Sequence, residues 1–379
     1  MHIHFIIDKG YPTSAQRVRY HNLIQRIALS NTVECTSYSV PFYQDDPLVR
    51  CNIVTQGRKT ISPRLGRLID RFVFPDRHIF NIRKYQSSLG RSMQVKMASA
   101  IILGMAPFSF LVMGKYLKAK YPDTMLIADL ADPFSFNMRY KTSRIRKYLA
   151  QLIESKCFSY FDCITVLNKQ IQDHYSFLYP HHAQKFVVLE QGIEPELINK
   201  VNLVSSVNNP TYTFLYTGTF YKRGRSPFPL YHAFSASGMN VRLFVYGNIK
   251  TSLRPPVSPK IEYHTAVPKD DLLPLITQAD ALVLVDNAYG FQEPGKTLET
   301  LGINKPILFI NDDSNSPAAY HAKMSGNVFW CKNYTSSISE AIKVIVDSKA
   351  AYTGLDISPY TWDQMYERLM RLLEKRSGG

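Results

Sequence analysis

The stretch Glu293-Pro-Gly-Lys-Thr-Leu-Glu-Thr-Leu-Gly302 is followed two residues later by the strand-like Lys305-Pro-Ile-Leu-Phe-Ile310. A Pro-Gly corner that opens a short helix places backbone N–H groups, the positive end of a helix dipole and Lys296 together, which favours phosphate binding. Glu299 follows about one helical turn later, and its carboxylate can accept hydrogen bonds from a vicinal diol such as a ribose. The stretch therefore favours binding of a nucleoside diphosphate, although a capped surface helix with a Lys–Glu pair explains the same residues.

Apolar runs and amphipathic segments alternate on both sides of this stretch. In the second half, strands are predicted at 213–217, 242–246, 261–264, 281–285, 306–310 and 328–331, with helices at 228–237, 270–278, 297–302 and 336–348. In the first half, strands are predicted at 2–7, 100–103, 125–128 and 163–166, with helices at 15–29, 108–120 and 169–177. This alternation predicts an α/β protein with parallel sheets covered on both faces, in which ligands bind at the carboxyl ends of the strands.

The 379 residues are too many for one ordinary core and fit two domains. A polar segment rich in Asn, Ser and Val predicts a linker at residues 196–210, between an amino-terminal domain at 1–195 and a second domain at 211–360. Residues 361–379 form a strongly amphipathic segment after Pro359, and we expect this helix to pack back toward the first domain. Two Rossmann-like, doubly wound domains facing each other across a cleft follow from this order.

The net charge of +15 lies mostly in the first half of the chain. Residues 1–200 contain 27 Lys and Arg against 15 Asp and Glu, a net of +12, which leaves +3 for residues 201–379. Apolar residues interleave with two basic clusters, Arg58, Lys59, Arg64, Arg67, Arg71, Arg77, Arg83, Lys84 and Arg91, and then Arg139, Lys141, Arg144, Arg146 and Lys147. This pattern favours an anionic membrane surface as partner over a merely solvated basic face. No nucleic-acid partner is expected, because no helix-turn-helix, zinc-finger or RNA-binding signature is present.

The amino terminus and the cysteines indicate the cellular compartment of the protein. The five Cys are scattered without metal-ligand spacing, which predicts a reducing compartment and no metal site. Met1-His-Ile-His-Phe-Ile-Ile7 is of strand length and lacks a cleavage signal, and Gly104 and Pro107 interrupt the longest uncharged run. We therefore expect a cytoplasmic protein without a transmembrane helix, associated peripherally with the inner face of the cell membrane.

Several motifs resemble one known family. In the second half they are Tyr212-Thr-Phe-Leu-Tyr-Thr-Gly218, Arg242-Leu-Phe-Val-Tyr-Gly247, the segment 272–284 and the Pro-Gly-Lys turn. In the first half they are Ala15-Gln-Arg-Val-Arg-Tyr-His-Asn-Leu23, Phe74-Pro-Asp-Arg-His78 and Ala128-Asp-Leu-Ala-Asp-Pro-Phe134. Together they resemble a retaining GT-B glycosyltransferase of glycosyltransferase family 4, of the bacterial polysaccharide type. Many members carry a Glu where this chain has Phe291, and members with a Pro-x-Lys-x-x-Glu pattern commonly lack it.

The resemblance implies roles for particular residues. The implied donor-binding residues are Gly218, Lys222, Arg223, Gly247, Glu293, Thr297, Glu299 and Arg19. The implied catalytic residues are Arg225 and Lys296, as cations facing the departing diphosphate, and Asp132 on the acceptor side. Asp132 equally suits a loop-capping role before Pro133, and the pattern around Asp129 indicates a buried structural carboxylate.

The resemblance predicts transfer of a sugar, with retention, from a nucleotide donor to a lipid-linked or growing glycan in cell-surface polysaccharide synthesis. No cofactor is expected, since the nucleotide sugar is a substrate, and the cations would replace a divalent ion. Two alternatives stay open: a nucleotide-sugar 2-epimerase of the same architecture, and a catalytically silent subunit that binds glycan or membrane. A nicotinamide dehydrogenase is disfavoured, because no Gly-x-Gly-x-x-Gly follows the first strand.

Overall fold

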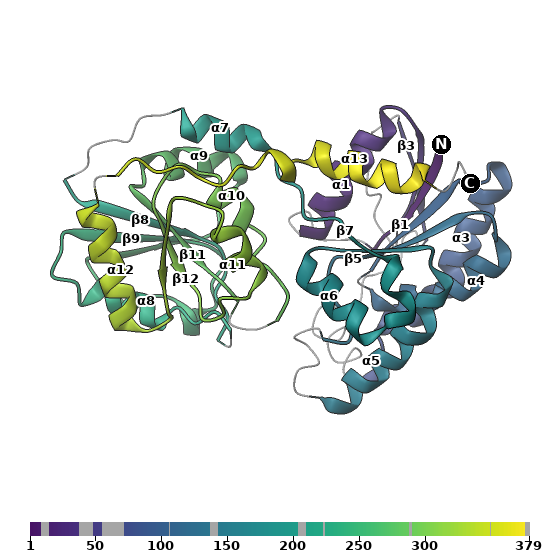
Figure 1. Ribbon diagram of the computed structural model, residues 1–379, viewed down its shortest axis with the longest axis horizontal. Helices are drawn as coiled ribbons and strands as arrows, with labels where there is room; N and C mark the ends of the chain where they lie inside the picture. The colour runs from purple at the N-terminus through teal and green to yellow at the C-terminus, as the bar shows by residue number, and fades with distance from the viewer. Residues whose placement is uncertain are drawn as a thin grey trace. The chain divides into compact units, whose positions relative to one another are not determined.

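The computed structural model divides the chain into two compact units (Figure 1). It describes residues 1–8, 15–37, 48–54, 72–105, 107–136, 143–203, 210–222, 224–287, 290–348 and 350–375. Unit 1 comprises Met1–Gly192 and Trp362–Gly379, and unit 2 comprises Ile193–Thr361. Among the described residues, no helix is both long and apolar enough to cross a bilayer.

In the described part of unit 1, seven parallel strands form one sheet. They are β1 (His2–Ile6), β2 (Thr32–Ser37), β3 (Val49–Ile53), β4 (Ala100–Gly104), β5 (Met125–Leu130), β6 (Cys163–Val166) and β7 (Phe186–Val188). Their order is β3-β2-β1-β4-β5-β6-β7, and Ile3 of β1 lies beside Ala100 of β4. Nearly every strand residue is buried, which is typical of a parallel sheet with both faces covered.

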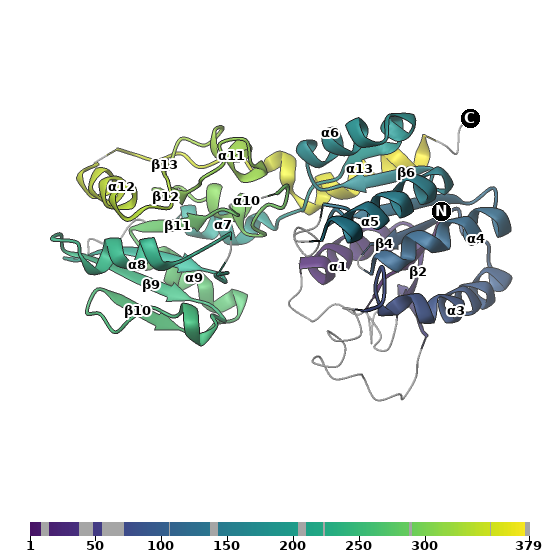
Figure 2. The ribbon, with the colours of Figure 1, turned by 90° about the horizontal axis from the view of Figure 1, so that it is seen from below.

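Helices cover both faces of this sheet. The α-helices of unit 1 are α1 (Ala15–Ala28), α3 (Ile82–Val95), α4 (Met113–Lys120), α5 (Arg144–Cys157), α6 (Lys169–Leu178) and α13 (Trp362–Glu374). Because side chains alternate along a strand, Ile3 and Phe5 face α1 and α13, while His4 points to the other side and lies 3.5 Å from Ser92 of α3. Helices α3, α4 and α5 lie on that second side (Figure 2). Short 3₁₀ segments add η1 (Arg77–Asn81), η2 (Phe108–Val112), η4 (Phe158–Tyr160) and η5 (Pro180–Lys185).

The last helix, α13, completes the core of unit 1. Trp362 is 1% exposed, and its indole ring lies so close to Gly192 that a Cβ there would approach the ring to 2.4 Å. At the exposed edge, Asp363 accepts a hydrogen bond from Arg26 of α1, at 2.6 Å. The end of the chain therefore belongs to the packing of unit 1.

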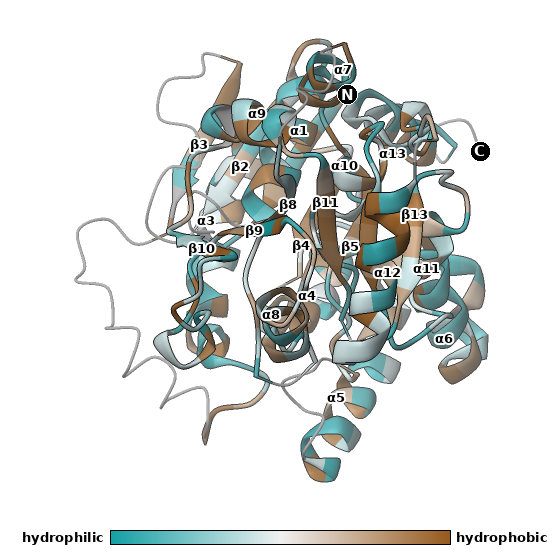
Figure 3. Ribbon diagram, turned by 90° about the vertical axis from the view of Figure 1, so that its left-hand side faces the viewer, coloured by the Kyte–Doolittle hydropathy of each residue, from teal (hydrophilic) through white to brown (hydrophobic). Residues whose placement is uncertain are grey.

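In the described part of unit 2, six parallel strands form a second sheet. They are β8 (Tyr212–Thr217), β9 (Val241–Tyr246), β10 (Ile261–His264), β11 (Ala281–Val285), β12 (Ile307–Ile310) and β13 (Val328–Cys331). The helices are α7 (Pro195–Asn202), α8 (Phe228–Ser235), α9 (Lys269–Gln278), α10 (Thr297–Leu301), α11 (Pro317–Ala322) and α12 (Thr335–Asp347), with 3₁₀ segments η6 (Thr251–Leu253) and η7 (Ser358–Tyr360). The apolar central strands lie between helical layers (Figure 3).

The strand order of unit 2, β10-β9-β8-β11-β12-β13, reverses direction between β8 and β11. The chain runs outward through β9 and β10, then returns past β8 to β11 and continues the other way. Such a reversal separates the loops that follow the two central strands, and it marks the place where open α/β sheets bind ligands.

Two sequence predictions need correction, and six elements were not predicted. The first seven residues of the predicted 196–210 linker belong to α7, because Ile198 and Val201 are buried in the core of unit 2. The predicted helix at 108–120 is a 3₁₀ segment, η2, followed by α4. The sequence analysis also did not predict β2, β3, β7, α3, α5 or α11. One reason is that β2 buries the polar residues Glu34 and Thr36, which conceals its apolar pattern.

Candidate functional site

Polar side chains gather at the carboxyl ends of β8 and β11, the two neighbouring strands between which the strand order of unit 2 reverses. Strand β8 ends at Thr217, followed by Gly218, and β11 ends at Val285, followed by Asp286 and Asn287. These strands are direct neighbours, with Ala281 beside Phe214, so the two loops begin side by side. Two predicted cations contact these loops.

Lys296 reaches the end of β8 from a turn 79 residues further along the chain. Its Nζ donates a hydrogen bond to Thr217 Oγ1 at 3.2 Å. The backbone N–H and the hydroxyl of Thr297 both donate to the carbonyl of Pro294, at 3.0 and 2.8 Å, which closes the turn that carries Lys296. Helix α10 has only five residues, so the charge of Lys296 matters more here than a helix dipole.

The second cation, Arg225, is held at the end of β11. Its Nη2 donates to Asn287 Oδ1 at 2.8 Å, and its Nη1 lies 3.4 Å from the carbonyl oxygen of Thr219. Its guanidinium also lies over the Tyr221 ring, 5.7 Å from the ring centroid. Within the described residues, the buried Nε of Arg225 has no hydrogen-bond partner. An unsatisfied buried donor costs roughly 1–3 kcal/mol, so a ligand oxygen or a water at this atom would be stabilising.

Asn287 connects the two cationic segments. While its Oδ1 accepts from Arg225, its Nδ2 donates to the carbonyl of Gln292 at 2.7 Å, in the loop that leads to Lys296. One amide side chain therefore fixes the basic loop and the Pro-Gly-Lys loop together. Sequence reasoning missed Asn287, although its place two residues after an apolar strand was an available signal.

The buried carboxylate of Asp286 holds this loop through hydrogen bonds. It is 4% exposed, and its Oδ2 accepts hydrogen bonds from Asn311 Nδ2, at 2.7 Å, and from the Ser316 hydroxyl. Its Oδ1 accepts from the backbone N–H of Asn287 at 2.6 Å. Burial raises the pKa of Asp286 to about 6, against the opposing effect of these hydrogen bonds. The sequence analysis did not single out this carboxylate.

The two predicted glycines meet at the same edge of the sheet. A Cβ on Gly247 would lie 1.8 Å from the carbonyl oxygen of Gly218, so only glycine allows this approach. Gly218 also has φ +153°, a conformation that side chains disfavour. Both positions therefore require glycine for structural reasons, and the absence of side chains there lets the ends of β8 and β9 come close together.

The other donor-side predictions have mixed outcomes. Thr297 is 1% exposed and its hydroxyl closes the turn, which gives its side chain a structural role beside the predicted contact with a donor. Glu293 Oε1 lies 2.8 Å from Nδ1 of the buried His321, which ties the loop to α11. Glu299 is partly exposed and Lys222 is exposed, whereas Arg223 lies outside the described residues.

In unit 1, Arg19 is not available to a donor. It is 0% exposed, and its Nε and Nη2 donate to the carboxylate of Asp129 at 2.8 and 2.9 Å. The guanidinium also donates to the carbonyls of Leu189 and Glu190, at 3.0 and 2.7 Å. These partners use the donor groups of Arg19 inside the core. These contacts give Arg19 a role in the core of unit 1 and do not support the prediction that it binds the donor phosphate. Arg19 lowers the pKa of Asp129 despite the burial of that carboxylate.

Asp132 lies in the loop after β5, and a buried carboxylate holds this loop. Glu154 Oε1 accepts from the backbone N–H of Ser135 at 2.9 Å and from the Tyr175 hydroxyl at 2.7 Å. The Tyr175 hydroxyl in turn accepts from the backbone N–H of Phe134 at 3.0 Å. Burial raises the pKa of Glu154. Glu154 and Tyr175 were missed by the sequence analysis, and they fix the backbone that presents Asp132.

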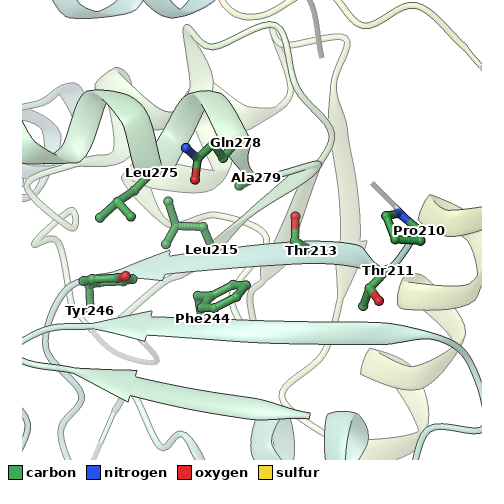
Figure 4. Close-up of a pocket in the computed structure, with 9 residues that line it drawn as sticks. All are labelled: Pro210, Thr211, Thr213, Leu215, Phe244, Tyr246, Leu275, Gln278 and Ala279. Carbon is green, nitrogen blue, oxygen red and sulfur yellow. The ribbon is translucent and has the colours of Figure 1, made fainter. Parts of the chain in front are cut away.

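A separate cavity of about 470 Å³ lies along β8, β9 and α9 in unit 2 (Figure 4). Leu215, Phe244, Tyr246 and Leu275 line it, and Thr211 and Thr213 extend it toward the start of β8. None of its lining residues is a Lys, Arg, Asp or Glu. The cavity therefore lacks the charges that a diphosphate needs and is distinct from the cationic edge.

Comparison with known proteins defines the fold. No protein-family model and no curated protein sequence matches the chain. Among solved structures, a sucrose-phosphate synthase from Thermosynechococcus elongatus is similar at a TM-score of 0.70 and 11% identity, covering 99% of this chain and 98% of that one. HepE from Anabaena in complex with UDP matches at a TM-score of 0.63 and 12% identity, covering 99% and 100%.

A UDP-GlcNAc 2-epimerase from Neisseria meningitidis, bound to UDP-GlcNAc, is similar at a TM-score of 0.55 and 12% identity, covering 99% and 100%. The two parallel Rossmann-like sheets and these similarities show that the chain has the GT-B fold. At such low identity the comparisons establish the fold alone.

Proposed function

We propose that this protein is a retaining glycosyltransferase that moves a sugar from a nucleotide-diphosphate donor to a hydroxyl of a lipid-linked or growing glycan, in polysaccharide synthesis. The observation that carries the proposal is the pair of cations at the carboxyl ends of β8 and β11 in unit 2. Lys296 is fixed on Thr217 and Arg225 on Asn287. UDP in the similar HepE structure supports a nucleotide donor.

In this proposal, unit 2 holds the leaving group. When the bond from the anomeric carbon to the diphosphate breaks, negative charge grows on the β-phosphate, and cations already in position stabilise it without reorganising. Lys296 and Arg225 supply that charge, and the unpaired Nε of Arg225 supplies a hydrogen-bond donor. Glu299 would accept hydrogen bonds from the ribose, Glu293, Gly218, Gly247 and Lys222 would line the donor, and Asp132 would orient or deprotonate the acceptor hydroxyl.

The same cations support activity without a divalent metal. Within the described residues, no group of three or more His, Cys, Asp or Glu has the arrangement of a metal site. Two positive side chains would instead offset the charge of the diphosphate. The test is donor turnover measured in excess EDTA. Complete loss of turnover in EDTA would refute metal independence. It would not contradict the proposed nucleotide site.

The decisive experiment compares two glycines. A Cβ added to Gly295, next to Lys296, or to Gly238, in a distant turn, meets no atom within 4 Å, so Gly295→Ala and Gly238→Ala have equal steric freedom in the protein. Binding of UDP, GDP, ADP, CMP and dTDP is measured by calorimetry and thermal shift for each variant. We expect Gly295→Ala to weaken nucleotide binding, because the methyl group would meet a phosphate near the turn, and Gly238→Ala to leave it unchanged.

Lys296→Ala completes this series. A charge-assisted hydrogen bond contributes roughly 1.5–3 kcal/mol, so the affinity for the diphosphate should fall about 10- to 100-fold. The melting temperature without ligand should hardly change, because the Lys296 side chain is partly exposed and water can replace its hydrogen bond to Thr217. If the variant loses stability and affinity together, or if no nucleotide binds the wild type, the proposed site is wrong.

A second candidate function is a nucleotide-sugar 2-epimerase. The similarity to a UDP-GlcNAc 2-epimerase favours it. The two reactions differ in their need for an acceptor: an epimerase inverts C2 of the donor sugar without one. NMR spectra of UDP-GlcNAc incubated with the protein alone distinguish them, since a new C2 epimer would favour this alternative over transfer.

A catalytically silent binding subunit is a further alternative. Phe291, where many members of the resembled family have Glu, is the feature that fits it, and such a subunit would leave every donor sugar unconverted.

A further inference from the structure

Three neighbouring helices of unit 1 share an unusual charge. Helices α3, α4 and α5 lie on the same side of the sheet, opposite α1 and α13 (Figure 2). Three Lys or Arg residues come from α3, three from α4 and four from α5, whereas Glu154 is their one acidic residue. Glu154 is 0% exposed and faces the interior. The outer surface of this helix layer is therefore cationic without acidic side chains of its own helices.

Helix α5 also exposes apolar side chains in a continuous stripe. Ile145, Tyr148, Leu149 and Leu152 are 74%, 61%, 39% and 50% exposed. Their spacing of i, i+3, i+4 and i+7 places them on one face of the helix. The opposite face buries Ala150, Glu154 and Cys157. The exposed apolar stripe is therefore separate from the buried face of α5, and Figure 3 shows apolar and polar segments alternating along the helix. Isolated exposed apolar residues are common, but a stripe of four large ones marks a contact surface.

Cations flank this stripe. Arg144 is exposed and directly precedes Ile145, and the exposed Lys156 lies one turn beyond Leu152 on the same side of α5. Exposed apolar side chains bordered by Lys and Arg are typical of helices that lie in the plane of a membrane interface. Tyr148 adds a ring with a polar tip, a side chain that favours the headgroup level.

A groove between α3 and α4 continues the cationic surface. It has a volume of about 510 Å³ and is lined by Arg83, Ser87, Arg91, Tyr116 and Lys120, among others. Gly90 of α3 faces Lys120 of α4 across this groove, since a Cβ there would lie 3.4 Å from Lys120 Nζ, at ordinary contact distance. Hydrogen-bond donors and positive charges around a shallow groove suit an anionic phosphate head.

We propose that the outer face of α3, α4 and α5 binds an anionic lipid bilayer, with the α5 stripe in the interface and headgroup phosphates on the surrounding cations. The charge of this face is complementary to anionic lipid, where each nearby Lys or Arg strengthens binding about fivefold. The α5 stripe distinguishes a bilayer from nucleic acid, because Ile and Leu gain by entering lipid and gain little on a phosphate backbone.

This surface explains part of the basic pattern in the sequence. Of the residues in that pattern, Arg83, Lys84, Arg91, Arg144, Arg146 and Lys147 lie on these helices, whereas Arg58, Lys59, Arg64, Arg67, Arg71, Arg139 and Lys141 lie outside the described residues. The membrane surface does not depend on the sugar-transfer proposal, since it uses no residue of the cationic edge in unit 2.

The test is flotation of the full chain with vesicles of phosphatidylcholine alone, and with vesicles in which phosphatidylglycerol replaces part of it. Arg144→Gln/Lys156→Gln removes two cations beside the stripe, and we expect about 25-fold weaker binding to the anionic vesicles. Ile145→Gln/Leu152→Gln removes apolar side chains that are already exposed, so folding is preserved and binding should fall by about tenfold. Lys343→Gln/Val344→Gln on α12, an exposed cation and apolar pair in unit 2, is the matched control and should bind as the wild type does.

Duplex DNA and RNA at the same salt concentration complete the comparison. Preferential binding to anionic vesicles, weakened by both α5 variants and not by the control, supports the proposal. Equal binding of all variants, absence of vesicle binding, or stronger binding to a duplex would each overturn it. The thermal shift with nucleotide should be the same in every variant, so a failure of the membrane surface is distinguishable from a failure of the nucleotide site.

Discussion

The buried carboxyl of Asp286 provides a quantitative test of the site geometry. Its folded pKa of about 6 lies above the ordinary value of 3.8, because burial disfavours the charged form. The folded state therefore binds the proton more tightly than the unfolded state does. This contribution to stability is complete below pH 4 and is lost as the pH rises through 6. About two pKa units at 1.36 kcal/mol each correspond to a loss of about 3 kcal/mol.

The substitution Asp286→Asn removes this titration and keeps the size of the side chain. The amide loses the hydrogen bond from the Asn287 N–H, so the variant should be less stable than the wild type at low pH. As the pH rises from 4 to 7, the wild type should lose about 3 kcal/mol relative to Asp286→Asn.

Urea unfolding of both proteins between pH 4 and pH 8 measures the difference, with Asp347→Asn at an exposed position of α12 as control. If the free energies of unfolding of wild type and Asp286→Asn stay parallel across this range, the burial argument for Asp286 is refuted.

Three further predictions concern single contacts. Arg225→Ala and Asn287→Ala should each weaken binding of a nucleoside diphosphate, and the double variant should lose about 1–2 kcal/mol less than the sum, because the two side chains share one hydrogen bond; additive losses by calorimetry would contradict the assigned coupling. Trp362→Ala should destabilise unit 1 by about 3–5 kcal/mol in urea unfolding, since the ring is buried against the core, and an unchanged midpoint would show that α13 adds little to unit 1. Tyr175→Phe removes the hydrogen bond to Glu154 and the one from the Phe134 N–H, so it should cost about 1–3 kcal/mol and raise KM for the acceptor, whereas unchanged stability would show that this hydroxyl does not hold the loop.

The periodicity of the sequence located most of the secondary structure because strand and helix patterns are local. The strands β6, β10, β11 and β13 have the bounds that the apolar runs predicted. The strands that were missed show the limit of this signal. Strand β2 buries Glu34 and Thr36, and its place in the sheet depends on partners from β1 and β3 rather than on its own pattern.

The candidate site shows the same division. The sequence alone placed Lys296 in a Pro-Gly turn at the start of a short helix, because the geometry of a turn is set by adjacent residues. Only the tertiary structure brought this Lys to Thr217, 79 residues away, and Arg225 to Asn287, 62 residues away. Parallel strands require long crossover connections, so their ends meet through chain segments that no local pattern relates.

The charged residues of unit 1 followed tertiary contacts as well. In the sequence, Arg19 is a basic residue on a helix, and its pairing with Asp129 spans 110 positions. The sequence likewise contained the apolar and basic residues of α5. It did not show which face of this helix would be buried. Composition and periodicity determined that the chain forms two parallel α/β sheets with a strongly basic first half. Which charges became buried structural pairs and which stayed exposed was decided by tertiary packing, because burial depends on segments that are distant in the chain.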